Sequence, residues 1–334
     1  MCVELIDDGR VADKVESQKI TQLRVAVAGL GTVGEGAALR LLEEARDYKL
    51  CAALVRDTSK LRAGLPDDIV ISSDVDAIFA THPDVIIDAL PVGDAGHALI
   101  EASLDRGIAI VSANKQALAG SLAAFAQKAQ ANNIKLCYAA SVGGGSPMIE
   151  TVRSACSAGE ITQITAILNG TVNYILSALA RGEDFNAAVK QAQDAGFAEP
   201  DPTADLSGDD AKAKISILCF EAFGREIDLN SVKTQPLDSE LAARMSAEGG
   251  VWRQLSRIRK DKAGHITASL AIEQVAPDSF FAGVLEEGNA LQIVTAGGQN
   301  FDCNGKGAGR RPTVASLFSD LATIKRSPPP VKTR

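Results

Sequence analysis

The pattern of apolar and polar residues divides the chain into two regions. In the first, from Leu23 to about Cys137, short apolar runs alternate with Ala-rich stretches that favour helix. Such alternation is typical of a parallel sheet wound with helices. We expect strands at LRVAVAGL, LCAALV, DVIIDAL, IAIVSA and IKLCYAA, and helices at EGAALRLLEEA, DAGHALIEASLDR and SLAAFAQKAQAN.

The pattern changes after the glycine run GGG at 143–145. Strand-like runs (ITQITAILNG, HITASLAIEQVA, ALQIVTAGG) now mix with helical ones (TVNYILSALARG, AAVKQAQDAG), which predicts a second, α+β domain. A loop, GKGAGRRPT, and a helix, VASLFSDLATIKR, follow. We expect an N-terminal extension at 1–20, a first domain at 21–142 plus 305–326, a second domain at 143–304 and a tail at 327–334.

Composition excludes several classes of protein. The net charge of -8 makes a nucleic-acid footprint unexpected, and no apolar run approaches the ~20 residues of a membrane span. The polar, acid-rich N-terminus and six scattered cysteines without a C-x-x-C pair lead us to expect a cytoplasmic protein with reduced thiols. The three histidines do not cluster, so neither a zinc site nor a Cys/His nucleophile is supported.

The motif GLGTVG, beginning at residue 29, has G-x-G-x-x-G spacing between the strand RVAVA and a helix. Its glycines permit a tight turn, close approach of a pyrophosphate and close helix packing, and the helix N-terminus supplies amide donors. A glycine turn in a nucleotide-free domain explains this context less well. We predict a Rossmann-type nucleotide-binding domain, α/β in class, with cofactor contacts from Gly29, Gly31, Thr32, Val33 and Gly34.

Two further strand ends bear on the cofactor. After LCAALV come Arg56, Asp57 and Lys60. A positive group there accommodates the 2′-phosphate of NADP, whereas Asp57 would suit the ribose hydroxyl of NAD; we favour NADP, with Arg56 and Lys60 as contacts. The strand IAIVSA ends in Asn114-Lys115, at the edge where open α/β sheets bind ligands, although a surface lysine is the usual alternative.

The segment 196–214, GFAEPDPTADLSGDDAKAK, carries five carboxylates ahead of an apolar helix. Ser207 and Asp210 have the spacing of a capping box, and acids suit a helix start, so a structural explanation exists. It does not explain Glu199 or Asp205, nor the i, i+4 pair of Asp210 with Lys214 on a buried helix. Spacing alone leaves function and structure equally open.

Together these segments resemble the homoserine dehydrogenase family over residues 23–325. The resemblance is carried by GLGTVGEG, VRDTSK, VSANKQALA, ASVGGGSPMI, ILNGTVNYIL, GFAEPDPTADLSGDDAKAK and GKGAGRRPT, in matching order and spacing. It implies NAD(P)-dependent interconversion of L-homoserine and L-aspartate 4-semialdehyde by a protein that is homodimeric through its second domain. It also favours a functional origin for the acidic segment.

The resemblance assigns a role to each candidate residue. Lys115 and Lys214 would be the catalytic lysines, and which of them is the base stays open. The substrate would be bound by Gly170, Thr171, Glu199, Asp205 and Asp210, and Asn114, Lys115 and Gly307 would approach the cofactor. The physics agrees, since carboxylates pair strongly with the substrate ammonium and a lysine can stabilise developing oxyanion character. A lysine whose pKa was lowered could act as the base near neutral pH.

Three residues depart from the family pattern: Ala139 replaces a glutamate, Val172 a small hydroxyl residue, and Lys306 the proline of GPGAG. The family binds Na+ or K+ largely through backbone carbonyls, which here would belong to Val142, Gly144 and Ser146. Because the sequence ends near 334, we also expect no threonine feedback through a C-terminal amino-acid-sensing domain.

The alternatives are a dehydrogenase for another small hydroxy or amino acid and a non-catalytic nucleotide-binding sensor. Both lysines are present, which argues against the sensor. The physiological direction, NAD against NADP, and the effect of Lys306 stay open.

Overall fold

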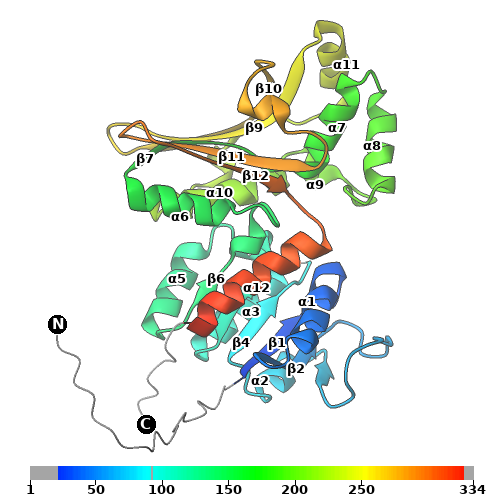
Figure 1. The fold of residues 1–334 in the computed structure, drawn as a ribbon, viewed down its shortest axis with the longest axis vertical. Helices are drawn as coiled ribbons and strands as arrows, with labels where there is room; N and C mark the ends of the chain where they lie inside the picture. Colours follow the sequence, from blue (N-terminus) through cyan, green and yellow to red (C-terminus); the bar gives the residue numbers. More distant parts are fainter. Residues whose placement is uncertain (1–21, 92, 327–334) are drawn as a thin grey trace, which may run out of the picture.

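The computed structural model describes residues 22–91 and 93–326, which form two lobes, each built on a six-stranded sheet (Figure 1). The expected extension at 1–20 and tail at 327–334 lie outside the described residues. No helix within the described residues is long and apolar enough to cross a membrane.

The first lobe contains a parallel sheet of order β3-β2-β1-β4-β5-β6. This is the strand order of the Rossmann fold, so the predicted fold class is confirmed. Its strands are β1 (Leu23–Ala28), β2 (Tyr48–Leu54), β3 (Val70–Ser72), β4 (Val85–Asp88), β5 (Ala109–Ser112) and β6 (Leu136–Cys137). Its helices are α1 (Thr32–Glu43), α2 (Val75–Phe79), α3 (Gly93–Asp105), α4 (Lys115–Leu118), α5 (Leu122–Ala131) and the C-terminal α12 (Arg310–Arg326).

The second lobe contains a mainly antiparallel sheet of order β12-β11-β7-β9-β10-β8, in which only the pair β10 and β8 is parallel. The strands are β7 (Ile161–Ile167), β8 (Lys233–Thr234), β9 (Val251–Lys260), β10 (Ile266–Val275), β11 (Gly288–Thr295) and β12 (Asn300–Lys306). The helices are α6 (Met148–Ala158), α7 (Gly170–Ala180), α8 (Phe185–Asp194), α9 (Thr203–Leu206), α10 (Asp209–Phe223) and α11 (Ser239–Glu248), with 3-10 turns η1 (Ala139–Ser141), η2 (Leu229–Ser231) and η3 (Phe280–Gly283).

The C-terminal helix α12 returns to the first lobe, where it lies beside α1 (Figure 1). Leu317 is fully buried in one cluster with Val27 of β1, and the ring of Phe318 meets Tyr48 edge-on, with centroids 5.6 Å apart. Because both faces of the first sheet are covered, its strands consist of nearly continuous apolar residues.

The predicted strand IKLCYAA is shorter than expected, since only Leu136 and Cys137 pair with β5 before the chain turns into η1. The physical reason is a hydrogen bond outside the sheet: the backbone N–H of Ala139 donates to Asp320 Oδ2 of α12 at 2.9 Å. Beyond η1 the chain crosses to the second lobe.

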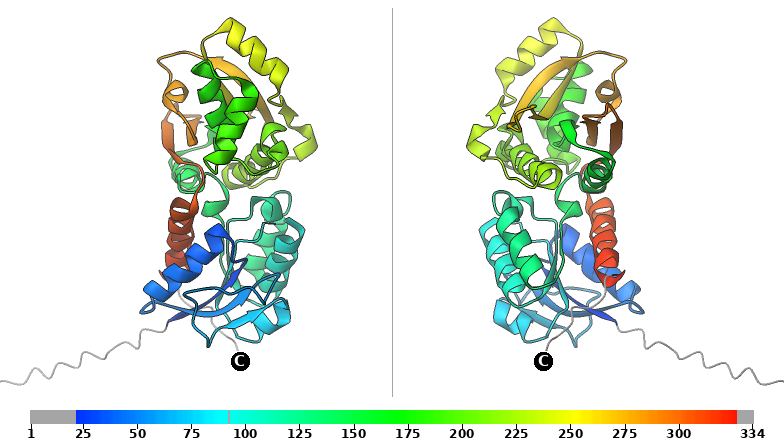
Figure 2. Two further views of the ribbon diagram at one scale, coloured as in Figure 1. Left: turned by 90° about the vertical axis from the view of Figure 1, so that its right-hand side faces the viewer. Right: turned by 90° about the vertical axis from the view of Figure 1, so that its left-hand side faces the viewer.

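The two crossings between the lobes lie against each other (Figure 2). The N–H of Gly145 donates to the carbonyl of Lys306 at 3.3 Å. A Cβ on Gly144 would lie 2.5 Å from the carbonyl oxygen of Gly307, so glycine is required at this close approach. The junction therefore brings the segment after η1 next to the loop before α12.

Candidate active site

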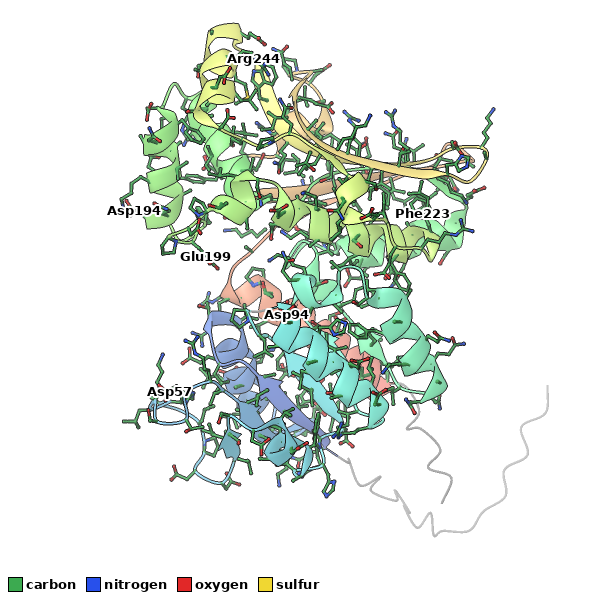
Figure 3. The ribbon with its side chains drawn as sticks, turned by 180° about the vertical axis from the view of Figure 1, so that it is seen from behind. Asp57, Asp94, Asp194, Glu199, Phe223 and Arg244 are labelled. Carbon is green, nitrogen blue, oxygen red and sulfur yellow. The ribbon has the colours of Figure 1, made fainter. Side chains whose placement is uncertain are left out.

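The carboxyl ends of β1, β4 and β5 lie at one edge of the first sheet, the edge that faces the second lobe (Figure 1). Figure 3 labels Asp94 at the start of α3 on this side of the first lobe, and Glu199 at the facing margin of the second lobe. Residues predicted from separate motifs meet at this junction, where open α/β folds bind their ligands.

Asp210 joins the two lysines of the predicted site. Its Oδ1 lies 2.9 Å from Lys115 Nζ, and its Oδ2 lies 2.7 Å from Lys214 Nζ. Lys115 begins α4 of the first lobe, whereas Asp210 and Lys214 lie one turn apart on α10 of the second. Asp210 and Lys214 are only 8% and 9% exposed, so the cluster links the lobes inside the protein.

Asn169, which the sequence analysis did not single out, orients both carboxylates of the cluster. Its Nδ2 donates to Asp205 Oδ1 at 2.7 Å and to Asp210 Oδ2 at 3.1 Å. Its Oδ1 accepts from the N–H of Val172 at 2.8 Å and so caps α7. An asparagine between a strand and a helix is a recognisable cap signal, but a cap does not reveal the two carboxylates.

The cluster sets the charge of its members. Burial raises the pKa of Asp210, but Lys214 and Lys115 together outweigh this and bring it to about 2. The same ion pair raises the pKa of Lys115 despite its burial. Burial and the neighbouring Asp210 raise the pKa of Asp205. The condition for a base near neutral pH, a lowered lysine pKa, is therefore not met by Lys115 in this arrangement.

The capping box considered as the structural explanation for Ser207 and Asp210 does not form. Gly208, with φ +88°, is the N-cap of α10. Ser207 Oγ donates to Asp209 Oδ2 at 2.9 Å and accepts from the N–H of Asp209 at 3.4 Å, but it does not bond the N–H of Asp210. The left-handed conformation suits a glycine better than a serine. Asp209 pairs with Lys212 at 2.7 Å on the outside of the helix, away from the buried cluster.

The remaining predicted substrate residues surround the cluster. Thr171 Oγ1 donates to the carbonyl of Phe197 at 2.7 Å, which ties the start of α7 to the segment carrying Glu199. Glu199 is exposed, and its charge contributes to the raised pKa of Lys115. Gly170 packs closely, since a Cβ there would lie 2.9 Å from the carbonyl oxygen of Glu287.

The glycine turn between β1 and α1 has space where a cofactor would approach. A Cβ on Gly34 would collide with the carbonyl of Gly29, which has φ +86°, whereas a Cβ on Gly31 would meet nothing within 4 Å. Thr32 is exposed and Val33 is half-buried at the start of α1. The free amides of this helix start fit a pyrophosphate.

Asn114 caps α4 and so fixes Lys115. Its Oδ1 accepts from the N–H of Ala117 at 3.2 Å. Asp88 is fully buried at the end of β4, where it accepts a hydrogen bond from Ser112 Oγ at 3.0 Å. Burial raises the pKa of Asp88 to about 6. Sequence analysis missed Asp88, although an acid closing the apolar strand DVIID is a usable signal.

In the loop after β2, the carboxylate of Asp57 is held by hydrogen bonds, whereas Arg56 and Lys60 are not held by ion pairs within the described residues. Asp57 Oδ1 accepts from the N–H and the Oγ of Ser59, at 2.9 and 2.6 Å, and these bonds lower its pKa. Arg56 and Lys60 are exposed, and neither forms an ion pair with any described residue. Figure 3 labels Asp57 in this loop.

The loop predicted to bind a cation, residues 142–146, lies next to the segment at Lys306 in the junction between the lobes. Ser146 is 3% exposed, and its Oγ has no hydrogen-bond partner among the described residues, while Val142 is fully buried. Lys306 pairs with Glu287 at 3.1 Å. Residues 22–91 and 93–326 contain no group of three or more His, Cys, Asp or Glu side chains able to hold a metal ion.

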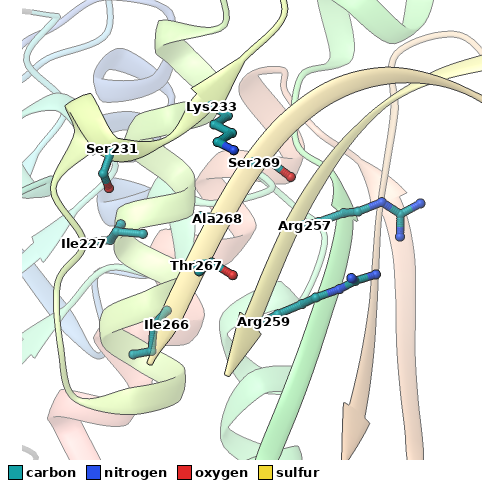
Figure 4. A pocket seen from close by; sticks show the side chains of 9 residues that line it. All are labelled: Ile227, Ser231, Lys233, Arg257, Arg259, Ile266, Thr267, Ala268 and Ser269. Atoms are coloured by element: carbon teal, nitrogen blue, oxygen red, sulfur yellow. The ribbon is translucent and has the colours of Figure 1, made fainter. Parts of the chain in front are cut away.

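A groove of about 480 Å³ lies elsewhere, on the second sheet (Figure 4). It contains three basic side chains, but Arg257 is bound to Glu273 by two hydrogen bonds, at 3.0 and 2.7 Å. The groove includes none of the predicted site residues, so its size does not identify the active site. Its lining is Ile227, Ser231, Lys233, Arg257, Arg259, Ile266, Thr267, Ala268 and Ser269.

A Rossmann lobe whose ligand edge meets a Lys-Asp-Lys cluster, buried at Asp210 and Lys214, defines a nicotinamide-nucleotide-dependent oxidoreductase. The homoserine dehydrogenase family model matches residues 147–322, and the model of the homoserine dehydrogenase NAD binding domain matches residues 29–139. The chain belongs to the homoserine dehydrogenase family.

Individual relatives agree. The chain is 29% identical over 320 residues to homoserine dehydrogenase of Bacillus subtilis, covering 91% of this chain and 73% of that protein. It is 32% identical over 254 residues to the NAD(+)-dependent homoserine dehydrogenase of Pseudomonas canavaninivorans, covering 73% and 71%. The crystal structure of a homoserine dehydrogenase from Thiobacillus denitrificans aligns with a TM-score of 0.82 at 28% identity, covering 92% of this chain and 74% of that one.

Proposed function

We propose that this chain catalyses the NAD(P)-dependent interconversion of L-homoserine and L-aspartate 4-semialdehyde. The observation that carries the proposal is the bridge from Lys115 through Asp210 to Lys214, which joins the cofactor lobe to the second lobe. When bound, the nicotinamide accepts or gives the hydride. The residues of this chain bind the substrate and handle the proton of its hydroxyl.

Lys214 has a donor left for the substrate oxygen. Its ammonium carries three N–H groups, of which one is given to Asp210 and another to the carbonyl of Leu168, at 2.8 Å. In the reducing direction a charged lysine donates to the oxygen as negative charge develops and then gives up a proton. In the oxidising direction a neutral lysine takes that proton, and Lys115 and Lys214 are both placed to contribute.

Asp205 and Glu199 are proposed to bind the substrate ammonium. Asp205 lies near Asp210 and has a raised pKa, so a cation that binds beside it relieves both burial and repulsion. Glu199 remains exposed at the margin of the junction, where it can close over the bound substrate. Gly170 and Thr171 line the same side from the start of α7.

For the cofactor we propose a preference for NADP, with Arg56 and Lys60 on the 2′-phosphate and the glycine turn, Asn114 and Gly307 along the rest of the molecule. The support is that the carboxylate of Asp57 is already bonded to Ser59, which leaves Arg56 the available group of the pair. A guanidinium suits a phosphate geometrically.

We also propose the division into a cofactor domain, 21–142 plus 305–326, and a substrate and dimerisation domain, 143–304, in a cytoplasmic homodimer. Carbonyls of Val142, Gly144 and Ser146 would hold Na+ or K+. The support for the cation is the buried Oγ of Ser146 beside that backbone, which has no hydrogen-bond partner in the part of the chain that the structure describes.

Steady-state kinetics test the proposal. Purified protein should reduce NADP, NAD or both when L-homoserine is added. In the reverse direction it should oxidise the reduced cofactor when L-aspartate 4-semialdehyde is added. A panel of other small hydroxy and amino acids, each assayed with both cofactors, is the control for substrate. Absence of homoserine-dependent turnover with either cofactor would overturn the proposal.

A further inference from the structure

Asn289, near the start of β11, shares a hydrogen-bond acceptor with Lys214, the carbonyl oxygen of Leu168. Its side chain is 0% exposed, and its Nδ2 donates to the carbonyl oxygen of Leu168 at 3.1 Å. The same oxygen accepts from Lys214 Nζ at 2.8 Å. Since a carbonyl oxygen has two lone pairs, Asn289 and Lys214 together satisfy it.

The other end of the Asn289 amide faces the loop GKGAG. Its Oδ1 is buried and has no hydrogen-bond partner among the described residues. A Cβ on Gly307 would collide with this amide, and a Cβ on Gly170 would lie 3.5 Å from Oδ1. Asn289 thus fills the space between the carbonyl that holds Lys214 and the loop that leads into α12.

The turn before Asn289 is held firmly. Asn173 Nδ2 lies within hydrogen-bond distance of the carbonyls of Val284, Glu286 and Gly288, at 3.1, 2.9 and 3.2 Å. The N–H of Glu286, which has φ +51°, donates to Ser177 Oγ at 3.1 Å. These contacts from α7 fix the backbone that carries Asn289.

We propose that Asn289 is a positioning residue, which orients the Leu168 carbonyl and thereby Lys214, and which sets the distance between that lysine and the loop at Gly307. The proposal rests on the proposed function. A buried polar atom without a partner is costly, so packing alone favours an apolar residue here. The donor to Leu168 explains why an amide stands in this position.

The test compares Asn289→Ala and Asn289→Asp with Asn132→Asp. Asn132 in the first lobe is the control for the hydrogen bond: its Nδ2 donates to the carbonyl of Leu104 at 2.9 Å, far from the site, although its side chain is exposed. We expect kcat with homoserine to fall about 10- to 100-fold in both Asn289 variants, as for a misplaced catalytic group, with little change in the KM for cofactor. Asn132→Asp should keep both constants.

A second readout does not depend on turnover. Reductive ¹³C-methylation of the lysines and NMR titration report the pKa of Lys214, whose signal is assigned by its loss in Lys214→Arg. A positioning role predicts that this pKa moves in Asn289→Asp and Asn289→Ala and stays fixed in Asn132→Asp. Gly307→Ala, which presses on the same amide from the other side, should move it as well.

The outcomes separate this proposal from the proposed function. If the wild type is inactive with homoserine, the function fails, and the Lys214 titration still decides the role of Asn289. If folded Asn289 variants keep kcat and the Lys214 titration within twofold and 0.2 pH units, roughly the limits of such measurements, a positioning role is excluded. Should they not fold, the Lys214 titration in Gly307→Ala decides, because Gly307 is itself a proposed cofactor contact and a change in its kcat would not be specific.

Discussion

Asp210 and Lys214 form a buried ion pair across one turn of α10, with Oδ2 and Nζ 2.7 Å apart. Breaking such a pair by neutralising one partner leaves a charge without compensation inside the protein, which costs about 3–5 kcal/mol. Removing the charge of Asp210 would leave two lysines without their partner, because its other oxygen forms an ion pair with Lys115 at 2.9 Å.

Asp210→Asn should therefore lower turnover about 100-fold or more and reduce the free energy of unfolding. The charge of Asp210 raises the pKa of Lys115, so its removal lowers that pKa. The rate of homoserine oxidation rises with pH as the lysine base becomes neutral, and this rise should move to lower pH in the variant. A pH profile of kcat for both proteins measures the shift.

The control for this variant is Asp209→Asn, one residue away. Asp209 lies on the exposed side of the same helix start, and within residues 22–91 and 93–326 its carboxylate pairs with Lys212 and Ser207 alone. Its neutralisation should leave turnover and the pH profile unchanged. An Asp210→Asn protein with the wild-type profile would show that the bridge does not set the lysine charges.

Lys214→Met tests the proton-handling role. Methionine fills much of the volume of the lysine stem, and Asp210 keeps its ion pair with Lys115, so the variant should fold with a reduced free energy of unfolding. Turnover should fall to the limit of detection because the donor to the substrate oxygen is gone. Cofactor affinity, measured by quenching or calorimetry, should stay within a few-fold, since Lys214 lies on the second lobe. Lys212→Met, two residues earlier and partly exposed, is the matched control. Retained turnover in Lys214→Met would remove this lysine from the mechanism.

Residues close in sequence could be predicted, and those brought together by the fold could not. The glycine turn at 29–34 and the pair of Asp210 with Lys214 follow from periodicity and spacing. Asn169 and Asn289 could not be found this way, because their partners lie on segments far along the chain.

Two departures from the sequence pattern have different causes. Gly208 holds the N-cap position that the spacing allowed for Ser207, because the backbone there is left-handed and glycine adopts that conformation without strain. The strand predicted over IKLCYAA ended early because a carboxylate on α12, unseen in a local window, captures the N–H of Ala139. The first outcome follows from local backbone conformation, and the second from a tertiary contact that strand propensity does not contain.

Arg56→Ala tests the cofactor preference. If Arg56 binds the 2′-phosphate, its loss should raise the KM for NADP about 10- to 100-fold and leave the KM for NAD within about threefold, the cost of one charge-assisted contact. Arg46→Ala is the control, since Arg46 is also exposed but lies at the other end of β2. An equal effect on both cofactors, or a wild type that strongly prefers NAD, contradicts the assignment.

Asp320 gives the protein a stability that depends on pH. It is 4% exposed on α12, and burial raises its pKa to about 7 against the hydrogen bond from Ala139, with Glu150, Arg153 and Glu221 as the charges acting on it. The unfolded carboxyl titrates near ~3.9, so between pH ~4 and ~7 the folded state binds more protons than the unfolded state. Stability should therefore fall as pH rises through this window.

Asp320→Asn removes this titration while its amide oxygen can still accept from Ala139. Relative to wild type, the free energy of unfolding of the variant should rise from pH 4 to 7 by on the order of 2–4 kcal/mol and then level off. Urea denaturation at intervals of half a pH unit measures it, with the exposed Asp278→Asn as control. A difference between variant and wild type that is constant from pH 4.5 to 8 would mean that Asp320 does not change its protonation on unfolding.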